Sequence, residues 1–282
     1  MLGLESGISH PPRLTPHGQD YGGSAYPINV SHDFKKLFDL VKDRTGYPVS
    51  VTPMENQTSH VTMRSATRDT PVHGIFPNPR YERFANYLVA TQCAMLLFKW
   101  SDPQGVSDFV VNDQKADFLK RKVVTSFQGK GMPTSTATQY ADSLVSGLLL
   151  QLTSSPLEIL SVGWCFREYP ELRVEQEAYI ATHLRELSAT LAPDIRKMTP
   201  REVYDRAVPM NAAYSLRWAD LSGERGGLLP YEALGFEKQG RELLKALESI
   251  SEDAPDVYRR SVDAWAERLH LSGWYRWSPR QT

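Results

Sequence analysis

The residues that could carry chemistry in this chain are seven histidines and two cysteines, and their spacing decides what they can do. No two histidines stand four positions apart, so the paired ligands of a helical zinc motif are missing. The sequence also lacks a Cys-x-x-Cys pair, a phosphate-binding loop and a Gly-x-Ser-x-Gly elbow. It therefore predicts no bound metal and no cofactor.

Two histidines and one cysteine gather in one stretch and are the candidates for catalysis. His60 and His73 fall on segments that we expect to be neighbouring strands, and Cys93 follows on the next helix. A thiol beside a histidine base is a nucleophile, and a histidine cluster is a metal site or a general base. A reactive cysteine is normally partly exposed in an electropositive site, whereas Cys93 lies deep in an apolar helix. We therefore expect Cys93 to be a core residue and both histidines to be hydrogen-bonded residues on strand surfaces.

Short strands and one helix must position these residues. The segments His60–Arg64 and Pro71–Phe76 have the composition of strands and are separated by a polar loop. The stretch Arg80–Trp100 is apolar nearly all round, with Asn78 placed as its N-cap and Pro79 at its first position. A helix that is apolar on every side is buried at the centre of its domain.

The remaining sequence predicts an α+β fold followed by a mainly helical half. Prolines and glycines in residues 1–27 predict an extended arm. Residues 28–133 should form a small antiparallel sheet packed on the central buried helix. Residues 134–282 should form a helical domain packed against it, because amphipathic segments follow one another there. The break at Gly129–Pro133 marks the predicted boundary between the two domains.

The bulk composition excludes several classes of partner. With Lys+Arg 32 against Asp+Glu 33 the net charge is -1, which gives no electrostatic footprint for nucleic acid. No apolar run approaches the roughly 20 residues of a membrane span, and no signal peptide is recognisable at the N-terminus. Cys93 and Cys165 lie in apolar surroundings, which favours two buried thiols in a reducing compartment over a disulfide. We therefore expect a cytoplasmic protein.

The order of elements from Phe34 to Trp100 resembles the small zincin domain of ImmA/IrrE-type proteins. It comprises a helix, a proline-bounded edge strand at residues 47–53, a hairpin that ends in Asn78-Pro79, and a central apolar helix. In that family the helix carries an Ala-His-Glu-Leu-Gly-His type run, whose histidines bind zinc and whose glutamate activates water. Here the corresponding run is Ala-Thr-Gln-Cys-Ala-Met at residues 90–95. The resemblance implies a zincin-like scaffold, a degenerate metallopeptidase, to which no catalytic residue can be carried over.

Two classes of function remain open, and the missing motifs favour the first. It is a non-catalytic interaction or regulatory protein whose groove between sheet and central helix binds a peptide, a protein partner or the chain's own arm. The predicted binding residues are His60, Arg64, His73, Tyr87 and Gln92. The alternative is a hydrolase whose site at the sheet–helix junction uses Cys93 or a cluster of His60 and His73.

Overall fold

The computed structural model describes residues 32–102 and 107–279, and the predicted arm of residues 1–27 lies outside them. The fold is α+β with a mainly helical second half. The chain divides into two compact units between Cys93 and Ala94, inside helix α2 (Ala85–Lys99), and not near Pro133 as predicted. We call them the first unit and the second unit and describe each by itself.

The first unit contains a three-stranded mixed sheet in the order β1-β3-β2. Its elements are α1 (His32–Thr45), β1 (Val49–Val51), β2 (Val61–Arg64), β3 (His73–Pro77), the 3-10 helix η1 (Pro79–Phe84) and the start of α2. β2 and β3 follow one another as a hairpin and are antiparallel, whereas β1 pairs with β3 in parallel. The prediction of a purely antiparallel sheet is therefore wrong for β1. The chain forms the two edge strands β1 and β2 first, and β3 then inserts between them.

Helix α2 begins later than its apolar pattern predicts. The Asn78 side chain accepts a hydrogen bond from the Arg80 amide at 3.1 Å, so the predicted cap is confirmed. The turn that follows is 3-10, and Tyr81, with φ −112° and ψ 22°, interrupts the helical backbone before Ala85. From there the helix is buried on nearly every side, as Leu88 and Leu96 illustrate with 2% and 0% exposure. The expectation of a buried central helix is confirmed.

The second unit is built from helices and one two-stranded ribbon. Its elements are β4 (Ser107–Val111), α3 (Asp113–Gln128), α4 (Thr134–Glu168), η2 (Pro170–Leu172), α5 (Arg173–Ala189), α6 (Pro193–Met198), α7 (Arg201–Ser222), α8 (Leu229–Ala233), α9 (Glu237–Glu248), α10 (Val257–Arg268) and β5 (Tyr275–Pro279). β4 pairs antiparallel with β5, and α3 packs on α4. These two contacts tie residues 107–128 to the helical unit and explain why no boundary falls at Pro133.

Helix α4 runs unbroken through a proline. Proline removes one i→i−4 hydrogen bond and costs about 3 kcal/mol in a helix interior, so a proline within a helical segment favours a break there. The structure has one helix of 35 residues with Pro156 inside it. Pro156 and its neighbours Leu152 and Leu157 are buried, so side-chain packing offsets the missing bond.

The same helix bears on the question of a membrane. Among the described residues α4 alone is long and apolar enough to cross a bilayer. Of its most apolar stretch, 61% is buried inside the protein. This is the burial expected of a core helix in a soluble protein.

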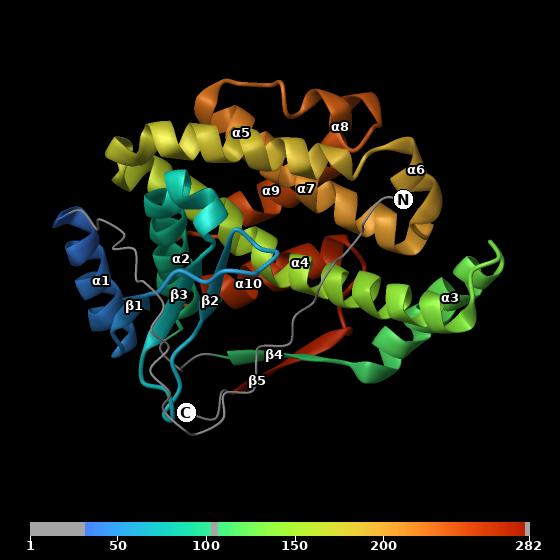
Figure 1. The fold of residues 1–282 in the computed structure, drawn as a ribbon, viewed down its shortest axis with the longest axis horizontal. Coiled ribbons are helices and arrows are strands. Elements are labelled where there is room, and N and C mark those ends of the chain that lie inside the picture. Colours follow the sequence, from blue (N-terminus) through green and yellow to red (C-terminus); the bar gives the residue numbers. More distant parts are fainter. Residues whose placement is uncertain (1–31, 103–106, 280–282) are drawn as a thin grey trace. The chain divides into compact units, whose positions relative to one another are not determined.

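Helices α7 and α9 lie side by side in the second unit, at a distance that depends on one glycine (Figure 1). A Cβ atom on Gly240 would come within 2.9 Å of the backbone of Ala212 and Ala213. No real side chain tolerates that approach, so glycine is required there for the two backbones to meet.

Candidate functional site

His73 is a structural residue of the first unit. Its side chain is fully buried, and its Nδ1 accepts a hydrogen bond from the Ala66 amide at 3.0 Å. Because Nδ1 is an acceptor, Nε2 carries the proton of the neutral ring and donates to the Thr45 hydroxyl at 3.0 Å. That hydroxyl in turn donates to the Tyr47 carbonyl. The ring thus joins β3 to the end of α1 and to the loop after β2, and neither nitrogen faces a ligand.

His60 lies at the other end of the hairpin. Its backbone carbonyl accepts a hydrogen bond from the Asn78 amide, just beyond the end of β3, whereas His73 begins that strand. At the usual rise of a strand this separates the two histidines by about 16 Å along the ladder. The His60 ring is half-buried and lies 4.0 Å from the Tyr81 ring, centroid to centroid. The predicted His60/His73 cluster is therefore not formed.

The predicted residues of helix α2 are mostly enclosed. Cys93 is completely buried, Tyr87 is 1% exposed, and Gln92 alone is half-buried. A thiol in an apolar helix interior lacks both the access and the positive surroundings that activate a nucleophile. Cys165 in α4 is buried as well, and neither cysteine forms a disulfide within the described structure, as the sequence predicted. Cys93 is a core residue.

Arg64 is the one predicted polar contact that is openly exposed. It ends β2 opposite Gly74, on the sheet face that also carries Phe76. Gly74 leaves room for the Phe76 ring, which a Cβ at that position would meet at 2.6 Å. The Arg64 guanidinium carbon lies 5.7 Å from the centre of the same ring. The exposed face of the hairpin therefore presents a cation supported by an aromatic ring.

The outer edge of β2 presents backbone groups that pair with no other strand among the described residues. In an antiparallel ladder alternate residues direct both backbone groups to the partner strand, and the residues between them direct both away. The bond from the Asn78 amide to the His60 carbonyl identifies His60, Thr62 and Arg64 as the residues that face β3. Val61 and Met63 consequently direct their N–H and C=O groups outward. Within the part of the chain that the structure describes, no backbone hydrogen bond reaches those groups.

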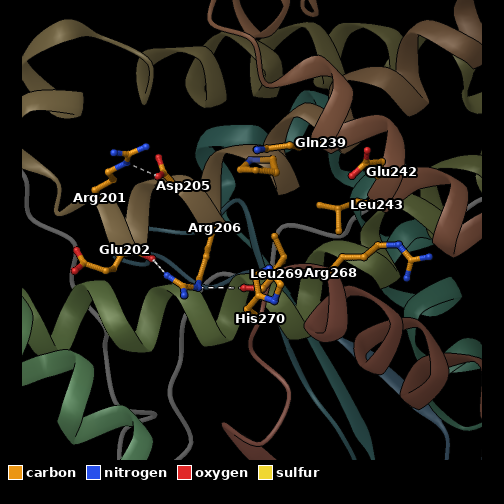
Figure 2. Close-up of a pocket in the computed structure, with 11 residues that line it drawn as sticks. Arg201, Glu202, Asp205, Arg206, Gln239, Glu242, Leu243, Arg268, Leu269 and His270 are labelled. Carbon is orange, nitrogen blue, oxygen red and sulfur yellow. Dashed lines mark hydrogen bonds and ion pairs between the residues drawn. The ribbon is translucent and has the colours of Figure 1, made fainter.

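A groove of about 620 Å³ lies in the second unit (Figure 2). It is lined by α7, α9 and the residues at the end of α10. Figure 2 shows two of its arginines held by neighbours: Arg201 pairs with Asp205 at 2.8 Å, and Arg206 Nε donates to the Leu269 carbonyl at 3.1 Å. Arg206 thereby satisfies a backbone carbonyl at the C-terminal end of α10. Sequence analysis missed this groove because its walls come from helices far apart in the chain.

The charges of that groove do not select one class of ligand. Its lining includes the cations Arg201, Arg206 and Arg268 and the anions Glu202, Asp205 and Glu242. Opposite charges in equal number produce no net field to attract an anion or a cation. The lining of the groove therefore does not indicate which class of ligand it would bind.

Glu158 of α4 is a half-buried carboxyl with a raised pKa. Burial raises its pKa above the ordinary value of 4.5, while the charge of His183 and a hydrogen bond from Ser154 lower it. The His183 ring stacks on Tyr179 at 5.8 Å between centroids, and its Nδ1 lies 3.6 Å from a carboxylate oxygen of Glu186. That distance is too long for a hydrogen bond. Glu158 is therefore a desolvated carboxyl that interacts with the charge of His183.

Comparison with known proteins does not add to this picture: no protein-family model, no curated protein and no solved structure matches the chain.

Proposed function

We propose that this protein is a non-catalytic, zincin-like binding protein and that an extended peptide segment of a partner pairs with the outer edge of β2. The observation that carries the proposal is the outward direction of the Val61 and Met63 backbone groups. Such an edge is a template for one more strand, whose main chain supplies hydrogen bonds irrespective of its sequence.

The positions of the catalytic candidates His60, His73 and Cys93 support a binding function. Both ring nitrogens of His73 are used inside the fold, and His60 stands at the far end of the ladder. Cys93 is enclosed in α2. The hydrolase alternative depends on the Cys93 nucleophile and the His60/His73 cluster, and the positions of these residues argue against it.

β2 is the strand that offers an edge to a partner. β3 is paired on both sides, so its backbone groups are already used. β1 is the other edge of the sheet, but it is bounded by Pro48 and Pro53, and proline cannot donate to a ladder. β2 has a hydrogen-bonded side toward β3 and contains no proline.

The proposal is tested by removing one outward donor. Val61→Pro deletes the N–H that faces away from β3, and a proline is tolerated at the first residue of a strand. Val61→Thr retains the N–H and the branched shape and is the matched control. A phage-displayed library of random peptides is selected on the full-length protein, and the dissociation constants of the enriched peptides are measured by fluorescence anisotropy. We expect Val61→Pro to weaken binding about tenfold, through the lost hydrogen bond and the bulk of the ring.

Circular dichroism and thermal melting verify that both variants are folded. Peptides that bind the wild-type protein and Val61→Pro equally well, or a selection that enriches no peptide, contradict the proposal.

A further inference from the structure

We propose that the segment bound along β2 carries an acidic side chain opposite Arg64 and an apolar side chain next to it, on the face of Met63. This inference rests on the proposed function and adds the chemistry by which the site distinguishes one peptide from another. The main-chain pairing of an added strand is indifferent to sequence, so specificity must come from the side chains on either face of β2.

The two faces of β2 differ in character. Thr62 and Arg64 are exposed on one face, whereas Val61 and Met63 are half-buried on the other. The register places Met63 opposite Ile75, a fully buried residue, so the second face is continuous with the apolar interior of the unit. A strand added at this edge has the same alternation, because directly paired residues point to the same face. Its side chains therefore meet a polar surface and an apolar surface in turn.

Arg64 supplies the charge that selects the polar side chain. It is the only charged residue of β2, and no ion pair engages it among the residues that the structure describes. Its guanidinium carbon lies 5.7 Å from the centre of the Phe76 ring and the side chain is exposed, and a guanidinium carries five N–H donors that can bind a carboxylate. A carboxylate on the paired strand would stand about 5 Å away, Cβ to Cβ, which is within reach of an arginine.

The other polar groups of this face are already occupied. The Thr62 hydroxyl donates to the Gln57 side-chain oxygen at 2.6 Å and lies 2.9 Å from the Ser59 hydroxyl. The Gln57 amide donates to the Phe76 carbonyl at 2.8 Å. This network leaves Arg64 as the group on β2 that discriminates between an acidic, a neutral and a basic partner side chain.

The test is a charge reversal read out by selection. The same random peptide library is selected in parallel on the full-length wild-type protein, on Arg64→Glu and on Arg68→Glu. Arg68 is exposed in the loop that follows β2 and serves as the matched control for a general change of surface charge. We expect the wild-type protein and Arg68→Glu to enrich peptides with Asp or Glu flanked by apolar residues. Arg64→Glu should enrich Lys or Arg at the same position.

The proposal also predicts the size of the charge preference and its dependence on salt. One exposed ion pair favours the acidic peptide over its lysine counterpart by up to about fivefold, and added salt reduces this preference. Enriched peptides without a charge preference, or a preference that Arg64→Glu leaves unchanged, overturn the inference. If Val61→Pro still weakens their binding, the proposed function stands and only the role of Arg64 fails. A preference reversed equally by Arg68→Glu also overturns it.

Discussion

Examples from the first and the second unit illustrate two kinds of buried polar group. In the first unit His73 and Asn78 are 0% and 4% exposed, and each makes hydrogen bonds to backbone groups of separate segments. In the second unit the phenol groups of Tyr204 and Tyr231 are buried, and no hydrogen bond of normal geometry reaches them among the described residues. The Ser215 hydroxyl is near enough to lower the pKa of Tyr231, yet the two groups do not complete such a bond.

The contrast is between buried polar groups whose hydrogen bonds stabilise the fold and buried polar groups that make no such bonds. A buried polar network whose members are all satisfied makes one arrangement strongly preferred, while an unsatisfied buried group costs about 1–3 kcal/mol. In the first unit the network runs through the ends of β3, which keeps the hairpin and its β2 edge in place. In the second unit the desolvation of half-buried Glu158 and the burial of two phenols are tolerated because apolar helix packing is extensive.

The largest expected effect comes from breaking the network of the first unit. His73→Leu preserves volume but leaves the Ala66 amide buried without its acceptor, so we expect a loss of about 2–3 kcal/mol in the free energy of unfolding. His60→Leu is the matched control. It changes a half-buried ring that contacts Tyr81 at a tilted angle, and we expect less than about 1 kcal/mol. Urea denaturation measures both, and equal losses for the two variants would show that His73 is no more structural than His60.

An intermediate effect is expected at Glu158, and it depends on pH. The folded state holds the proton of this carboxyl more tightly than the unfolded state, because its pKa is raised from 4.5. The folded protein therefore binds more protons, and its stability falls as the pH rises from 4.5 through the raised pKa.

Glu158→Gln removes this titration. Its melting temperature should exceed that of the wild-type protein at neutral pH, and the gap should close as the pH falls toward 4.5. Glu177→Gln, at an exposed position of α5, is the control and should leave the pH profile unchanged. A wild-type profile that rises over this range, or a gap that is independent of pH, argues against a desolvated carboxyl at Glu158.

The smallest effects are expected at the buried phenols. Tyr231→Phe and Tyr204→Phe remove hydroxyl groups that have no hydrogen-bond partner in the described structure, so each should change stability by less than about 0.5 kcal/mol or be slightly stabilising. Tyr275→Phe is the contrast, because its hydroxyl donates to Asp263 at 2.5 Å, and it should be destabilising by about 1 kcal/mol. Thermal unfolding compares the three. A larger loss at Tyr231 than at Tyr275 would reveal an internal water bound to the phenol.

Local sequence signals predicted much of the fold and the exposed part of the site. Asn78 as a cap, the burial of Leu88 and the edge position of β1 all follow from residue types and spacings within one or two turns or strands. The exposure of Arg64 and the burial of Cys93 follow in the same way from their places in alternating and all-apolar segments.

Tertiary contacts decided the rest, because the deciding partners lie far along the chain. β4 acquires its strand partner only in β5, at the far end of the second unit's sequence. Pro156 stays helical because the buried face of α4 outweighs one missing hydrogen bond. His73 looked like a surface histidine in a short strand, and only the approach of Thr45 and Ala66 commits both of its nitrogens to the interior. Propensity and periodicity describe neighbours in sequence, whereas hydrogen-bond satisfaction depends on which distant segments meet.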